Sequence, residues 1–181
     1  MSNLIQVGDF TYGHETIQVM SWGEGARLFV GKFCSIANDV RIFLGGNHNS
    51  DWISTYPFGH INQDVLGDKK SLGHPSTNGD VNIGHDVWIG FGVTIMSGVT
   101  IGSGAIVAAN SHVVSNIPDY EIWGGNPAKM IRSRFPAEIR EKLLEIRWWD
   151  YPVEKIIKVK ELLNSTLSTT NLDAIERILK N

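Results

Sequence analysis

The chain has 181 residues, of which 42% are hydrophobic and 19% are charged, and its formal net charge is −3. This suits one globular domain and excludes the basic surface typical of nucleic-acid-binding proteins. A single cysteine excludes an internal disulfide. We see neither a signal-peptide pattern nor an apolar run long enough to span a bilayer, so we expect a cytoplasmic protein without membrane insertion.

β-Branched aliphatic residues recur at every sixth position over much of the chain. The first row is Val30, Ile36 and Ile42, followed after a gap by Ile83, Ile89, Ile95, Ile101, Val107 and Val113. A second row, four positions later, is Val87, Val93, Val99, Ala105, Ser111 and Ile117. Neither the 3.6-residue period of a helix nor the two-residue period of an ordinary strand explains this spacing.

A stack of coils made of short parallel strands does explain a period of six. Each strand would place one stiff aliphatic side chain in a narrow core, and neighbouring coils would bury one another. Glycines that follow the first row, such as Gly84, Gly90 and Gly102, would let the backbone approach closely at the corners. A plain β-sandwich is the alternative, but its strands do not keep a six-residue phase for this long.

The periodicity divides the chain into segments of a single domain, residues 1–181. The first coils occupy 24–42, and the main β-helix with its final turn occupies 81–135. The spacing from Ile42 to Ile83 is not a multiple of six, so residues 43–80 form an inserted loop, and loops of that length are usually functional. The pattern changes after Pro118, and the segment GGNPAKMIRSRF, with Gly124, Gly125 and Pro127 as turn signals, should leave the stack. Residues 136–181 predict three helices, the first opening at Pro136 and the third capped by Asn171, which together form a cap or packing arm.

Several stretches together resemble a known family. They are GNHNSDWISTYPF in the loop, GDVNIGHDVWIGFGVTIMSGVTIGSGAIVAANSHVV in the coils, WGGNPAKMIRSRF after them, and RWWDYPVEKI. The chain resembles the hexapeptide-repeat acetyltransferases, in the xenobiotic branch that includes chloramphenicol and streptogramin acetyltransferases and relatives from surface-polysaccharide gene clusters. The resemblance covers about residues 30–156, and the NHxxDxxSTYPF and GGNPAKxIRxRF motifs are its most specific parts.

The resemblance implies a mainly β fold: a left-handed parallel β-helix of hexapeptide repeats with an inserted active-site loop and C-terminal α-helices. It also implies a homotrimer, with the active site between neighbouring subunits and acetyl-CoA as cosubstrate. His48 matches the family's catalytic histidine, and histidine is a suitable general base for a hydroxyl near neutral pH. The thioester is already activated, so we expect neither a metal nor an acyl-enzyme.

Further site residues follow from the resemblance and from chemistry. Asp51, Trp52 and Tyr56 are candidates for binding the acceptor, because flat rings suit sugars and macrocycles. The coil pattern implicates Trp88, Phe91, Ala109 and Val114 in binding acetyl-CoA. Lys129, followed by Arg132 and then Arg134, is the candidate for a CoA phosphate. We expect the remaining histidines, including His60 and His74, to have surface or structural roles, and Cys34 to be a packed core thiol.

The acceptor stays open at this stage. A sugar or glycan hydroxyl, from a surface polysaccharide or a nucleotide-sugar, is favoured because DWISTYPF departs from the shorter DGSTYPF form of the streptogramin enzymes. The alternatives are an antibiotic hydroxyl (chloramphenicol or streptogramin A) and an amino-sugar amine. Two other classes fit less well: a γ-type carbonic anhydrase needs a zinc-binding histidine pair that the spacing does not offer, and a scaffold without catalysis would not need these motifs.

Overall fold

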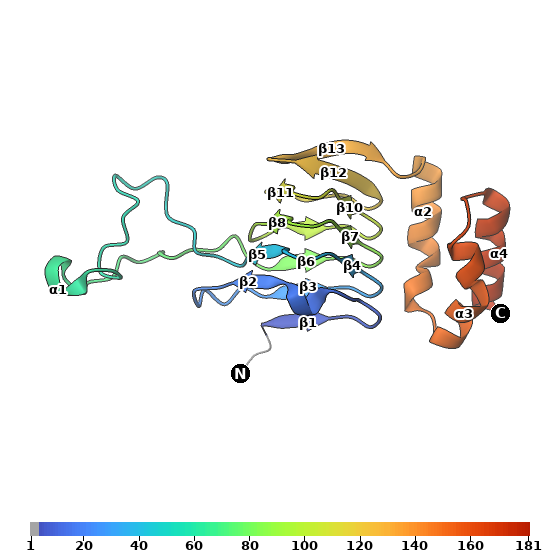
Figure 1. Cartoon of the computed structure of the whole chain (residues 1–181), viewed down its shortest axis with the longest axis horizontal. Helices are drawn as coiled ribbons and strands as arrows, with labels where there is room; N and C mark the ends of the chain where they lie inside the picture. Colours follow the sequence, from blue (N-terminus) through green and yellow to red (C-terminus); the bar gives the residue numbers. More distant parts are fainter. Residues whose placement is uncertain (1–3) are drawn as a thin grey trace. The chain divides into compact units, whose positions relative to one another are not determined.

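A computed structural model describes residues 4–181, and the chain divides into two compact units, residues 1–133 and 134–181. The first unit is a stack of short strands (Figure 1). Its strands are β1 (Ile5–Val7), β2 (Gln18–Met20), β3 (Leu28–Val30), β4 (Ser35–Ile36), β5 (Arg41–Phe43), β6 (Val81–Ile83), β7 (Trp88–Ile89), β8 (Thr94–Ile95), β9 (Thr100–Ile101), β10 (Ile106–Val107), β11 (His112–Val113), β12 (Glu121–Gly125) and β13 (Ala128–Ser133).

Three sheets form the sides of the stack. Their strand orders are β1-β3-β6-β9, β13-β12-β10-β7-β4 and β11-β8-β5-β2, and all pairs are parallel except β12 with β13. Residues eighteen apart pair with each other, as Ile83 does with Ile101 and Ile89 with Val107. Three hexads therefore make one coil, which confirms the coil architecture predicted from the six-residue period.

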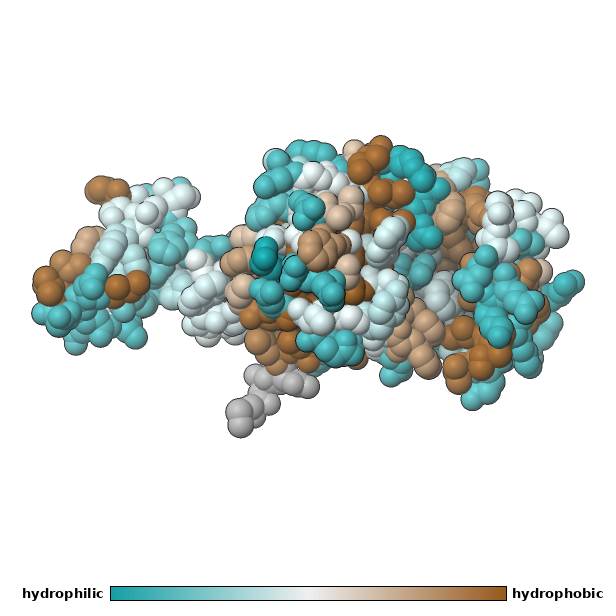
Figure 2. Space-filling model, viewed as in Figure 1, coloured by the Kyte–Doolittle hydropathy of each residue, from teal (hydrophilic) through white to brown (hydrophobic). Residues whose placement is uncertain are grey.

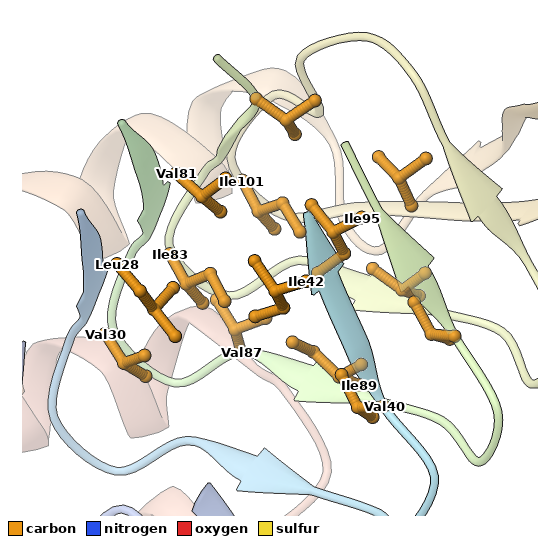
Figure 3. Close-up of a cluster of buried hydrophobic side chains, with 14 of the residues drawn as sticks. Leu28, Val30, Val40, Ile42, Val81, Ile83, Val87, Ile89, Ile95 and Ile101 are labelled. Atoms are coloured by element: carbon orange, nitrogen blue, oxygen red, sulfur yellow. The ribbon is translucent and has the colours of Figure 1, made fainter. Parts of the chain in front are cut away.

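Both predicted rows of aliphatic and small residues point into the core. Every member is buried, including Ser111, whose hydroxyl donates to the Ala108 carbonyl at 2.6 Å. Figure 3 shows the side chains of three successive coils converging on one narrow interior, among them Ile42, Ile89 and Ile95. Because each strand contributes so few inward side chains, the stability of each coil depends on the coils next to it.

The corners of the coils use glycine in two ways. The predicted row sits where neighbouring backbones nearly touch: a Cβ on Gly90 would lie 2.6 Å from the Ala109 nitrogen. A second row, also six residues apart, has positive φ and was not predicted. It consists of Asp86, Gly92, Gly98, Gly104 and Asn110. These residue types adopt the left-handed conformation at lower cost than others, so the corners repeat with the strands.

The stack extends beyond the predicted coils at both ends. At its start, β1 and β2 pair with β3 and β5 and add a coil ahead of residue 24. At its other end, β12 stacks on β10 in parallel, and β13 folds back on β12 as an antiparallel hairpin. The prediction that GGNPAKMIRSRF leaves the stack is therefore wrong, because Gly125 donates its N–H to the Ser111 hydroxyl of the stack and β13 pairs with β12.

The inserted loop leaves the stack after β5 and returns at β6. Its only helix is α1 (Gln63–Leu66), at the end of the loop far from the strands in Figure 1. β3 pairs directly with β6, so the coils stack as if the loop were absent. Apolar side chains are exposed on the loop, and Figure 2 shows apolar surface at its far end. The most exposed of them are Ile53, Ile61, Val65, Leu66 and Leu72, here called the loop's apolar tip.

The second unit contains the predicted helices. They are α2 (Ala137–Ile146), α3 (Val153–Leu163) and α4 (Thr169–Lys180), with short 3₁₀ turns at His14–Thr16 in the first unit and Trp148–Asp150 in the second. The predicted cap of the third helix is wrong: Ser168 is the N-cap, and its hydroxyl accepts the Asn171 N–H at 3.1 Å. No helix among residues 4–181 has the length and apolar character to cross a membrane.

Candidate active site

The two arms of the inserted loop are joined where they meet the stack. Asn47 and Ser76 form an antiparallel bridge, each donating its backbone N–H to the other's carbonyl at 3.0 Å. The buried hydroxyl of Ser97, on the β-helix, accepts the side-chain amide of Asn47 at 3.3 Å and the backbone N–H of Asn78 at 3.2 Å. This loop root, residues 44–48 and 74–79, is thus fixed to a rigid scaffold, as a catalytic residue requires.

His48 stands at the end of the loop root with an exposed side chain. Its Nδ1 lies 2.6 Å from the backbone carbonyl oxygen of Thr55. A carbonyl oxygen can only accept, so Nδ1 carries the proton and the Nε2 of a neutral ring carries the lone pair. His48 can therefore act as a base through Nε2, and the group that orients it, which the sequence left open, is a backbone carbonyl.

Two further histidines of the loop pack beside His48. The ring centroids of His48 and His74 are 4.4 Å apart, and those of His74 and His60 are 5.0 Å apart, both edge-on. The sequence assigned His60 and His74 only general surface or structural roles, so it missed their position beside the base. Burial, and then the neighbouring His48 and His60, lower the pKa of His74, which favours its neutral form.

Glu24 is a second residue that the sequence did not identify. Its carboxylate accepts the backbone N–H groups of Gly46 and, at 2.9 Å, Trp22. Burial acts to raise the pKa of Glu24, but these hydrogen bonds, with a smaller contribution from His74, outweigh it and hold the pKa below its usual value. Glu24 therefore links the start of the stack by a hydrogen bond to Gly46 of the loop root, which lies two residues before His48.

We expect Glu24→Ala to loosen the loop root and leave the coils intact. A hydrogen bond to a charged group contributes about 1.5–3 kcal/mol, so the Gly46 amide should exchange with solvent about tenfold faster. Because folding lowers the pKa of Glu24, its hydrogen bonds stabilise the loop root at pH values above the ordinary carboxyl pKa. This stabilisation is lost as the pH falls through the lowered pKa of folded Glu24, so protection of the Gly46 amide should fall in that pH range in the wild type but not in Glu24→Ala. Hydrogen exchange measures this, with exposed Glu15→Ala as control. Equal protection in both variants would contradict the assignment.

The candidate acceptor residues lie on the arm that follows His48. Asp51 is exposed, and its backbone N–H donates to the Asn49 side chain at 2.9 Å. Trp52 is half-buried. The Tyr56 hydroxyl accepts the Asn62 side-chain amide at 2.7 Å. These side chains follow His48 within eight residues, and all three are at least partly exposed.

The candidate residues for acetyl-CoA lie on the coils and the final hairpin. Trp88 faces outward and is 56% exposed, in one cross-strand row with Ile106, Ile122 and Arg132. Phe91 is also exposed, and its carbonyl accepts the N–H of the residue after Ala109 on the adjacent coil. The row has the Trp88 ring at one end and the Arg132 guanidinium at the other. Three strand spacings separate these two residues, or about 14 Å.

The remaining candidates for acetyl-CoA are less closely grouped. Lys129 is exposed on β13 opposite Gly124, close in sequence to Arg132. Val114 is exposed but follows β11, in a different sheet from Trp88. A single chain therefore gathers the aromatic and cationic candidates around one sheet and leaves Val114 at another corner.

Other reactive groups do not form a site. Cys34 is fully buried, with its Sγ 3.1 Å from the Gly84 carbonyl oxygen, which confirms that it points into the core. Burial raises the pKa of the Cys34 thiol, so it is a poor nucleophile. Within residues 4–181, no group of three or more histidine, cysteine, aspartate or glutamate side chains is arranged to hold a metal ion.

Comparison with known proteins agrees with this description. Residues 80–115 match the family of bacterial transferase hexapeptides (six repeats). The chain is 46% identical to a probable macrolide acetyltransferase from Lysinibacillus sphaericus, over 78% of this chain and 79% of that relative. It is 40% identical to a chloramphenicol acetyltransferase from Escherichia coli, over 77% of this chain and 67% of that relative.

A solved structure of similar fold is a hexapeptide-repeat acetyltransferase from Vibrio cholerae in complex with acetyl-CoA. The two share 26% identity with a TM-score of 0.53, over 74% of this chain and 62% of that one, so this chain spans less than two thirds of the Vibrio protein.

The stack of hexapeptide coils places the chain in the class of hexapeptide-repeat transferases. The chain belongs to the hexapeptide-repeat acetyltransferase family, with the left-handed β-helix fold of that family. It is an acyltransferase that uses acetyl-CoA, as the resemblance implied.

Proposed function

We propose that the protein is an O-acetyltransferase in which His48 is the general base. The observation that carries this proposal is the hydrogen bond from His48 Nδ1 to the Thr55 carbonyl at 2.6 Å, which places the lone pair of the neutral ring on Nε2 of an exposed side chain. Nε2 takes the proton of the acceptor hydroxyl while the hydroxyl oxygen attacks the acetyl carbonyl carbon. The C–S bond then breaks, and the CoA thiolate leaves with the proton returned by the same imidazole.

The acceptor is proposed from two different observations. The relatives of this chain are named for macrolide and chloramphenicol, which favours an antibiotic hydroxyl and reverses the order of preference drawn from the sequence. The loop motif DWISTYPF, which departs from the shorter streptogramin form, keeps a sugar or glycan hydroxyl as the second candidate.

A panel of acceptors tests the function. Thiol release from acetyl-CoA is measured with chloramphenicol, a macrolide, a streptogramin A, and several sugars and nucleotide-sugars, and product mass shows whether oxygen or nitrogen was acetylated. Release with an antibiotic supports the first candidate, and release with a sugar supports the second. Absence of acetyl-CoA binding in calorimetry would contradict the proposal as a whole.

We further propose a homotrimer with the reaction between subunits. The inserted loop projects from the stack and exposes its apolar tip, which would be costly to leave in water. Three copies related by symmetry would cover three such tips and bring each His48 toward the coils of a neighbour. Sedimentation equilibrium tests this, and a mass of one 20.1 kDa chain would contradict it.

Lys129 is the proposed contact for a CoA phosphate, with Arg132 on the same strand as the next candidate. Trp88, Phe91 and Ala109 are proposed to flank the pantetheine, and Val114, which follows a strand of a different sheet, is proposed to flank it from a neighbouring subunit. We expect Lys129→Met to raise the KM for acetyl-CoA about tenfold with little change in kcat, because a charge-assisted hydrogen bond is lost from substrate and transition state alike. Steady-state kinetics measure this. Exposed Lys160→Met, in the helical unit, is the control. An unchanged KM would remove Lys129 from the site.

A further inference from the structure

Three imidazole rings from separate parts of the inserted loop form one packed group. His74 is the central ring, because it makes edge-on contacts with both His48 and His60 at interplanar angles of 71° and 81°. His74 lies on the returning arm of the loop, and His48 lies on the outgoing arm. The base therefore contacts a residue 26 positions away in the chain.

The loop root sets this contact. The antiparallel bridge between Asn47 and Ser76 lies one residue before His48 and two residues after His74, so both histidines leave the same short ladder. The hydroxyl of Thr77 also donates to the carbonyl of Leu44 at 2.5 Å. Because both histidines lie within two residues of this bridge, their contact is anchored to the stack even though the rest of the loop projects from it.

We propose that His74 is a positioning residue that holds the His48 imidazole in the orientation in which Nδ1–H meets the Thr55 carbonyl. This inference rests on the proposed role of His48 as the base. A histidine ring has a broad, roughly two-fold torsion at its second side-chain bond, so one hydrogen bond by itself allows the ring to turn over, which would put Cδ2 in the place of Nδ1 and release Nδ1–H from the Thr55 carbonyl. A second ring packed 4.4 Å away restricts that turn.

The charge state of His74 is consistent with this role. The ionisable groups that act on it are His48, His60 and Glu24, of which only Glu24 favours its protonated form. Burial and the two histidines prevail and lower the pKa of His74. A neutral His74 does not repel the positive charge that forms on His48 when Nε2 accepts a proton, so the packed ring can stay in place during the reaction.

Nuclear magnetic resonance of histidine ring nitrogens tests the proposal without any acceptor, so its result is independent of whether the proposed function is right. In the wild type at pH 8, we expect His48 as the Nδ1–H tautomer. His74→Ala should raise the Nε2–H form at least twofold, whereas His74→Phe, which keeps a ring, should retain the wild-type tautomer. Asp68→Ala, an exposed change on the same arm, is the control.

Kinetics provide the second measurement, with acetyl-CoA and whichever panel acceptor supports release. We expect His74→Ala to lower kcat about tenfold with an unchanged KM for acetyl-CoA, and His74→Phe to stay within about threefold of the wild type. A wild-type His48 tautomer in His74→Ala would overturn the proposal, as would equal losses in the Ala and Phe variants. If His74→Ala does not fold, His74→Asn replaces it, with the same two outcomes.

Discussion

His48→Ala is expected to lower kcat by about a hundredfold or more, because removal of a general base costs about 10²–10⁴ in rate. The alcohol would then have to attack while still holding its proton. The KM for acetyl-CoA should stay within about twofold, since the candidate residues for that substrate lie on the coils and the final hairpin and not on the loop. Steady-state thiol release, compared with the wild type, measures both quantities.

His14→Ala is a suitable control for this variant. It also removes a histidine, but His14 lies near the start of the chain, where its Nδ1 is 3.1 Å from the Thr11 carbonyl oxygen. It should leave kcat unchanged. Full activity in His48→Ala, with folding verified by circular dichroism, would show that the base is elsewhere, and the three-histidine group would then lose its proposed role.

The β-helix was predictable because its geometry repeats. An aliphatic side chain at Ile83 recurs at Ile89 and Ile95, since each coil places three short strands at fixed intervals around one core. The pattern even survives the insertion, because β3 pairs with β6 whatever lies between them. Periodic burial is a local signal, so the sequence alone is enough to detect it.

The contacts around the base were not predictable in the same way. The hydrogen bond from Gly46 to Glu24 and the ring contact between His48 and His74 each join residues more than twenty positions apart. No periodicity links the positions of Glu24 and His74 to that of His48. The Thr55 carbonyl leaves no trace in the sequence, because every residue has one. His48 itself was found through a motif, so the resemblance identified the residue and the folded loop defines its surroundings.

Small errors at element ends have a similar cause. Asn171 and Ser168 are both good N-cap residues, and the choice between them depends on where the chain turns. The final hairpin was missed because Gly124, Gly125 and Pro127 are typical of turns, whereas β12 is also held by its parallel pairing with β10. In both places, hydrogen bonds to neighbouring segments decided between two locally acceptable conformations.

Ile95→Asp is expected to prevent folding of the β-helix. Ile95 is fully buried in β8, between Ile42 of β5 and Val113 of β11. A carboxylate there would have no partner in an aliphatic core, and burial of an unpaired charge costs several kcal/mol on top of the lost packing. A single domain has only about 5–15 kcal/mol of stability, so this loss is a large part of it.

Thr100→Asp is the matched control, because Thr100 is exposed on β9 and its side chain points away from the core. It should give a folded protein with nearly the wild-type melting temperature. Ile95→Val should cost about 0.5–1.5 kcal/mol, as expected for removal of one buried methyl group. Far-ultraviolet circular dichroism and thermal melting distinguish the three variants. A folded Ile95→Asp protein with a wild-type melting temperature would mean that the inward register of the coils is wrong, because only an outward-facing position such as Thr100 on β9 is expected to tolerate a charge.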